Sequence, residues 1–98
     1  MKKIKASGTL HHFVEKMQRG IGKTKLAGIV SFHEEKEGMY VQFEKLGTSK
    51  IHYIVNQEES GFVANIKKEN VAFTHGMFRK DVEKQLVEMM RRFGAEVD

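Results

Sequence analysis

The sequence predicts an α+β fold in two layers, with an antiparallel sheet of four to five strands and two helices packed on one face of the sheet. Apolar and polar residues alternate in several short segments in the middle of the chain, which is typical of strands with one buried face. A segment at each end instead carries apolar residues at helical spacing. The predicted strands are joined by short turns, so neighbouring strands are expected to run antiparallel.

The composition is that of one ordinary globular domain. The chain has 98 residues, which we expect to form a single domain over 1–98. It contains no cysteine, and this excludes disulfides, thiolate catalysis and cysteine-ligated zinc. The basic start, Met1 to Lys3, is not followed by the apolar stretch of a signal peptide. We therefore expect a cytoplasmic protein without membrane contact.

The N-terminal quarter is predicted to form a strand and then a short helix. Apolar and basic residues alternate over 2–7, which suits a short strand that ends at Gly8. Thr9 can cap the helix that follows. The helix has an apolar face with residues at helical spacing: Leu10, Phe13, Val14 and Met17. Gly20 and Gly22 are expected to end it.

Four strands are expected in the middle of the chain, and turn-forming residues separate them. They are predicted over 25–33, 39–46, 50–56 and 62–67, and a short strand over 71–74 would make five. In the last three of the four, one face is apolar: Met39, Val41, Phe43, Ile51, Tyr53, Val55, Phe62, Ala64 and Ile66. This face is expected to lie against the helices.

A long helix is predicted at the C-terminus. Its apolar stripe consists of Phe78, Val82, Leu86, Met89, Met90 and Phe93. Thr74 or His75 can cap its start, and Gly94 is placed to end it. The resulting order, β-α-β-β-β-β-α, is that of a helix-grip-like arrangement, and an arrangement by itself implies no function.

The most informative functional feature is the uneven distribution of charge. Residues 1–25 hold seven basic residues and one acidic residue, in a chain of formal net charge +4. A concentrated positive field attracts anionic partners. The predicted anion-binding residues are Lys3, Lys5, Lys16, Arg19, Lys23 and Lys25. The alternative is that these charges only keep the protein soluble and protect an edge strand.

No catalytic motif is present in the sequence. The segment from Gly20 to Thr24 ends like a phosphate-binding P-loop, but it follows a helix and precedes a strand, the reverse of the order that a P-loop needs. The five histidines lack the spacing of a metal site, and His11 and Glu15 are spaced only for a surface pair. We therefore expect no metal, no cofactor and no enzymatic activity. An enzyme of unrecognised type ranks third, after the binding module and the pocket protein that are described next.

The sequence favours a small, non-catalytic binding or regulatory module that uses its basic N-terminal patch. The expected partner is a nucleic-acid backbone or an acidic protein surface. Among aromatic and histidine residues, we expect only Tyr40 and His52 on the outer strand face. Since bases stack on such residues in single-strand binders, contact is expected to be without sequence specificity.

Two further hypotheses concern the C-terminal helix. A curled sheet over a helix that carries methionines can enclose a small apolar ligand. The residues predicted to line such a pocket are Met17, Phe78, Val82 and Met89. Val87 and Met90 would widen the apolar stripe toward solvent, which suggests a homodimer or partner interface.

Overall fold

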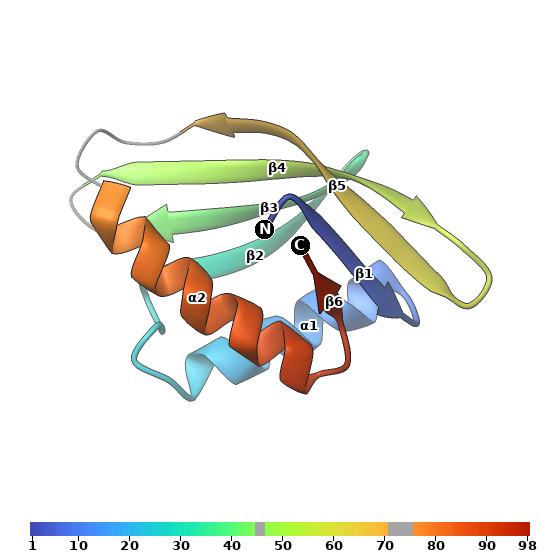
Figure 1. Cartoon of the computed structure of the whole chain (residues 1–98), viewed down its shortest axis with the longest axis horizontal. Helices are drawn as coiled ribbons and strands as arrows, with labels where there is room; N and C mark the ends of the chain where they lie inside the picture. The colour runs from blue at the N-terminus through green and yellow to red at the C-terminus, as the bar shows by residue number, and fades with distance from the viewer. Residues whose placement is uncertain (45–46, 71–75) are drawn as a thin grey trace.

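The computed structural model describes residues 1–44, 47–70 and 76–98, with residues 76–79 described by their backbone alone. It confirms an α+β fold with an antiparallel, curled sheet and two helices on the same side of it (Figure 1). The elements are β1 (Lys3–Ser7), α1 (Leu10–Gly22), β2 (Val30–Glu35), β3 (Gly38–Glu44), β4 (Thr48–Gln57), β5 (Gly61–Asn70), α2 (Gly76–Arg92) and β6 (Glu96–Val97). The prediction of four to five strands is wrong, because the described sheet has six, in the order β2-β3-β4-β5-β1-β6.

Helix α1 begins where the sequence predicts. The Thr9 hydroxyl accepts a hydrogen bond from the His12 backbone N–H at 3.2 Å and so caps the helix. Gly20, predicted as a terminator, lies inside α1 instead. A Cβ atom at this position would lie 3.1 Å from the Met89 sulfur and 3.1 Å from the Phe93 ring. The missing side chain therefore lets α2 approach α1 closely.

Strand β2 begins at Val30, five residues later than predicted. The residues before it form a turn, in which the Ile29 backbone N–H donates to the Leu26 carbonyl oxygen at 2.9 Å. Gly28 has a φ of +79° there, a conformation that side chains disfavour. The turn contains apolar residues because Leu26 is buried in the core, and these apolar residues led to the prediction of a strand.

Strands β2 to β5 form a meander, and the predicted apolar face is the one that lies against the helices. Phe32, Val41, Phe43, Ile51 and Phe62 on this face are each at most 1% exposed. The ring of Phe13 from α1 contacts the rings of Phe32 and Phe62 edge to face. These contacts hold α1 on the sheet.

The two ends of the chain meet in the sheet, because β1 lies between β5 and β6 (Figure 1). Ile4 of β1 pairs with Ala64 on one side and with Val97 on the other. Strand β6 has two residues, too few to show an alternating pattern in the sequence. Helix α2 ends as predicted at a glycine, since Gly94 has a φ of +90°.

The predicted strand over 71–74 and the predicted helix caps, Thr74 and His75, lie outside the described residues. Within the described residues, no helix is both long and apolar enough to cross a membrane.

Candidate functional site

The face of the sheet that points away from both helices carries a row of ring-bearing side chains. His33, Tyr40 and His52 are direct cross-strand partners on β2, β3 and β4, and Lys68 of β5 pairs with His52. Residues that face each other across antiparallel strands have neighbouring side chains on one face. The register therefore places three rings and a lysine in one line across four strands.

The three rings are in contact. The ring centroids of His33 and Tyr40 lie 4.8 Å apart with their planes 20° apart, and those of Tyr40 and His52 lie 5.4 Å apart. The Lys50 ammonium lies 5.0 Å from the centroid of the Tyr40 ring, within the range of a cation–π interaction. All four side chains are half-buried. Tyr40 is thus held between two imidazoles and beneath a positive charge.

Each histidine of the row is also held by a polar partner. His33 Nε2 and Ser31 Oγ are 2.7 Å apart, and His52 Nδ1 and Glu35 Oε2 are 2.8 Å apart. These hydrogen bonds fix the orientation of both imidazoles. The result is an ordered surface of rings with polar edges, which we call the ring row (His33, Tyr40 and His52).

The predicted anion-binding residues are divided between the two sides of the sheet. Lys3 and Lys5 flank the buried Ile4 in β1, so they lie on the outer face, the same face as the ring row. The remaining four belong to α1 and the turn after it, on the helix side: Lys16, Arg19, Lys23 and Lys25. The structure therefore does not join all six in one patch, and their role in anion binding stays a prediction.

Two of these lysines have a charged or aromatic neighbour. Lys5 pairs in register with Glu96 of β6, so a carboxylate lies beside that part of the outer face. The Lys16 ammonium lies 5.2 Å from the centroid of the Phe93 ring and covers the end of α2.

The sequence did not reveal three members of the outer face: His33, Lys50 and Lys68. Because β2 was predicted to end at His33, its last alternating residues were not assigned to a face. The signal was present in the period-two pattern of Ser31, His33 and Glu35, which all lie on one side of the strand.

Three of the four residues predicted to line an apolar pocket are part of the core. Met17, Val82 and Met89 are 0%, 3% and 9% exposed. The side chain of Phe78 lies outside the described residues. The binding of a small apolar ligand in this region stays a prediction.

The placement of Met90 toward solvent is wrong, since this residue is 0% exposed, and Val87 is half-buried against the core. Helix α2 packs against α1 as well as against β6 of the sheet.

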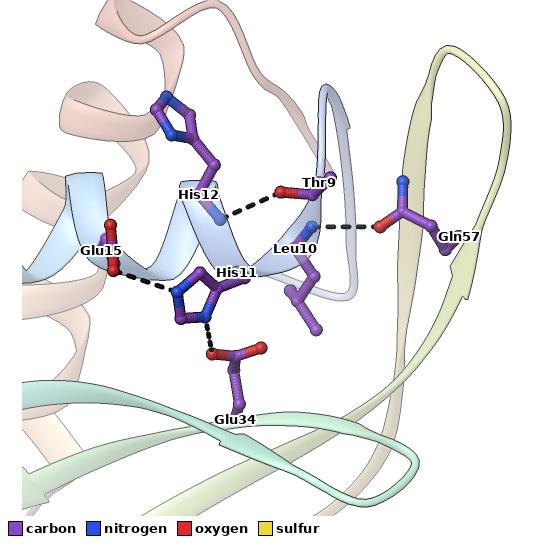
Figure 2. Close-up of polar contacts among 7 residues, drawn as sticks. All are labelled: Thr9, Leu10, His11, His12, Glu15, Glu34 and Gln57. Atoms are coloured by element: carbon purple, nitrogen blue, oxygen red, sulfur yellow. Dashed lines mark hydrogen bonds and ion pairs between the residues drawn. The ribbon is translucent and has the colours of Figure 1, made fainter.

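A second polar cluster ties the start of α1 to the sheet (Figure 2). The two nitrogens of His11 lie between two carboxylates, with Nδ1 2.6 Å from Glu34 Oε2 and Nε2 3.0 Å from Glu15 Oε1. The hydrogen bond to Glu34 and the negative charges of both glutamates raise the pKa of His11 above its ordinary value of 6.5. Nearby, the Leu10 backbone N–H donates to Gln57 Oε1 at 3.1 Å.

Among the residues whose placement is described, no group of three or more histidine or acidic side chains has the arrangement of a metal site. Comparison with known proteins finds no match, whether among protein-family models, curated proteins or solved structures. The outer face with its ring row is therefore the candidate site on geometry alone.

Proposed function

We propose that this chain is a small, non-catalytic binding module that contacts single-stranded nucleic acid with the outer face of its sheet. The observation that carries the proposal is the ring row on an uncovered sheet face, with Lys50 over the central ring. Single-strand binders combine aromatic side chains with lysines that contact the phosphate backbone. An acidic protein surface would use the lysines but would have no need of the rings.

The lysines on this face supply the charge for backbone contact. Lys3, Lys5 and Lys68 are exposed, and Lys50 is half-buried. Each phosphate that a lysine neutralises releases condensed counterions, so the affinity is expected to fall as the salt concentration rises. This term is independent of base sequence.

The geometry of the rings also limits how bases are contacted. His33 stacks on the Tyr40 ring, and the tilted His52 ring and the Lys50 ammonium lie close to the same ring, which limits the stacking of a base on it. We expect bases to meet the polar edges of the rings, where imidazole and phenol groups can form hydrogen bonds. The expected sequence preference is weak.

The test compares removal of two charges on each side of the sheet. A Lys5→Gln/Lys50→Gln variant and an Arg19→Gln/Lys23→Gln variant lose the same charge, and fluorescence anisotropy measures their binding to a labelled single strand at ~50 mM and ~200 mM salt. We expect only the first variant to weaken binding and to reduce the slope of log affinity against log salt by about 1.4, or about 0.7 for each lost phosphate contact.

If only the Arg19→Gln/Lys23→Gln variant weakened binding, the binding site would lie on the helix side, where most of the predicted anion-binding residues lie. Absence of binding by the unmodified protein at low salt would end the proposal. Circular dichroism of each variant checks that the fold is retained.

The helix-grip-like arrangement is kept here as an architectural proposal only. Met17, Val82 and Met89, three of the residues predicted to line a pocket beneath α2, are packed in the core, which does not favour an apolar ligand there. A cytoplasmic location and a homodimer likewise stay predictions.

A further inference from the structure

A bulge in β5 brings two consecutive lysines to one side of the sheet. His52 pairs with Lys68 and the next residue, Tyr53, pairs with Ile66, which leaves Lys67 as an extra residue without a partner in the register. In a regular strand, consecutive side chains point to opposite faces. A bulge interrupts this alternation and redirects a side chain. Lys67 and Lys68 consequently line the same cavity.

The cavity lies on the outer face at one end of the ring row and has a volume of about 300 Å³. Its walls come from the end of β2, from the turn between β2 and β3, and from β4 and β5 beside the bulge: Glu35, Lys36, Glu37, His52, Tyr53, Lys67 and Lys68. This volume is at the small end of the range for ligand pockets in proteins. A single small group, rather than a whole nucleotide, fits such a space.

The charges in this cavity favour an anion. Both acidic side chains already have cationic or imidazole partners, since Glu37 lies 3.4 Å from the Lys67 ammonium and Glu35 is bonded to His52. No ion pair involving Lys36 or Lys68 is found among the described residues. Three lysines therefore face two glutamates, and the excess charge is positive.

We propose that this cavity binds a terminal phosphate, that is, a phosphomonoester at the end of a strand. A terminal phosphate carries about −1.5 to −2 charges at neutral pH, whereas an internal phosphodiester carries one, so a lysine pocket discriminates between them. His52 belongs both to the cavity and to the ring row, so a strand whose end occupies the cavity can continue along the row. This inference rests on the proposed function and adds that the protein binds a strand at a phosphorylated end.

The experiment compares single strands of one sequence that carry a 5′-phosphate, a 3′-phosphate or no terminal phosphate. Fluorescence anisotropy is expected to show about tenfold tighter binding for a phosphorylated strand, the effect of one added charge-assisted contact. Lys68→Gln should remove this difference, whereas Lys84→Gln, which removes an exposed charge on α2, should leave it intact. Equal affinity for all three strands would overturn the inference and leave the proposed function standing.

A second variant is expected to increase the preference of the cavity for a phosphorylated strand. Glu37→Gln releases Lys67 from its ion pair and raises the positive charge of the cavity, so the preference for the phosphorylated strand should increase several-fold. Glu58→Gln removes an exposed carboxylate from the turn between β4 and β5 and serves as the matched control. An unchanged preference in Glu37→Gln would contradict the assignment of Lys67 to the site.

If no strand binds, the proposed function fails, and the pocket is then tested by itself. Titration with inorganic phosphate and with AMP is followed by the backbone amide NMR signals of Lys67 and Lys68. Shifts that saturate in the unmodified protein and disappear in Lys68→Gln would support a pocket that takes a free phosphate or the phosphate group of a mononucleotide whose remainder lies outside the cavity. Absence of such shifts would overturn the inference.

Discussion

At the scale of single residues, His11 links α1 to β2 through its Nδ1 atom, which contacts Glu34, while its Nε2 atom pairs with Glu15 within α1 (Figure 2). Glu34 and Glu15 raise its pKa above 6.5, so the folded state binds the imidazole proton more tightly than the unfolded state does. The stability contributed by this proton is complete below the unfolded pKa. It is lost as the pH rises through the folded pKa.

We therefore expect His11→Gln to destabilise the protein more at about pH 5 than at about pH 8.5, relative to the unmodified protein at the same pH. Urea denaturation followed by circular dichroism measures this difference in the free energy of unfolding. His12→Gln, at the exposed next position of α1, is the control and should not show this dependence. A loss of stability in His11→Gln that is equal at both pH values would exclude the link between this proton and folding.

At the scale of elements, the contact between α1 and α2 depends on Gly20. A Cβ atom there would lie 3.1 Å from both the Met89 sulfur and the Phe93 ring, which is closer than ordinary van der Waals contact. The outer face depends similarly on the bulge in β5, which changes the direction of the side chains of a strand. Gly20 therefore determines how closely two helices approach, and the bulge determines which side chains of β5 lie on the outer face.

Gly20→Val is expected to destabilise the fold by about 1–3 kcal/mol, because a branched side chain forces the helices apart. Met89→Ala, which makes room at the same contact, is expected to cost about 2–5 kcal/mol alone. The double variant should be more stable than the sum of the two losses implies, with a coupling of about 0.5–3 kcal/mol. Chemical denaturation of the four proteins gives this coupling, and strict additivity would mean that the two residues do not share a contact.

At the scale of the whole molecule, the sheet joins the first and last strands. Ile4 is 0% exposed and lies between β5 and β6, while the Tyr53 hydroxyl donates to the Met1 carbonyl oxygen at 2.6 Å. One core cluster includes side chains from both helices and from all six strands. We expect unfolding to be a single cooperative transition.

Ile4→Ala is expected to lower the free energy of unfolding by about 2–5 kcal/mol, since it leaves a cavity between the sheet and the helices. Far-UV circular dichroism and tyrosine fluorescence should shift together in this variant, because the ends of the chain and the meander share one core. Ala6→Gly, at a half-buried position of the same strand, is the milder control. A separate early transition of the fluorescence would show that β1 and β6 open independently.

Much of the fold follows from short-range patterns in the sequence. The buried face of β3 to β5, the cap at Thr9 and the end of α2 at Gly94 depend on neighbouring residues, so periodicity and capping rules predicted them. For the candidate site, the same rules placed Tyr40 and His52 on the outer face. Strand alternation is a local property, because side-chain direction depends on the backbone of the residue itself.

The other features were decided only by tertiary structure. The ring row needs the register of three strands, the proposed phosphate pocket needs a bulge, and the raised pKa of His11 needs Glu34 from β2. The burial of Met90 and the separation of Lys3 and Lys5 from the basic residues of α1 depend on how distant segments pack. Sequence periodicity indicates which face of a strand a side chain occupies, but not which strand lies beside it, because pairing is settled by the packing of the whole core.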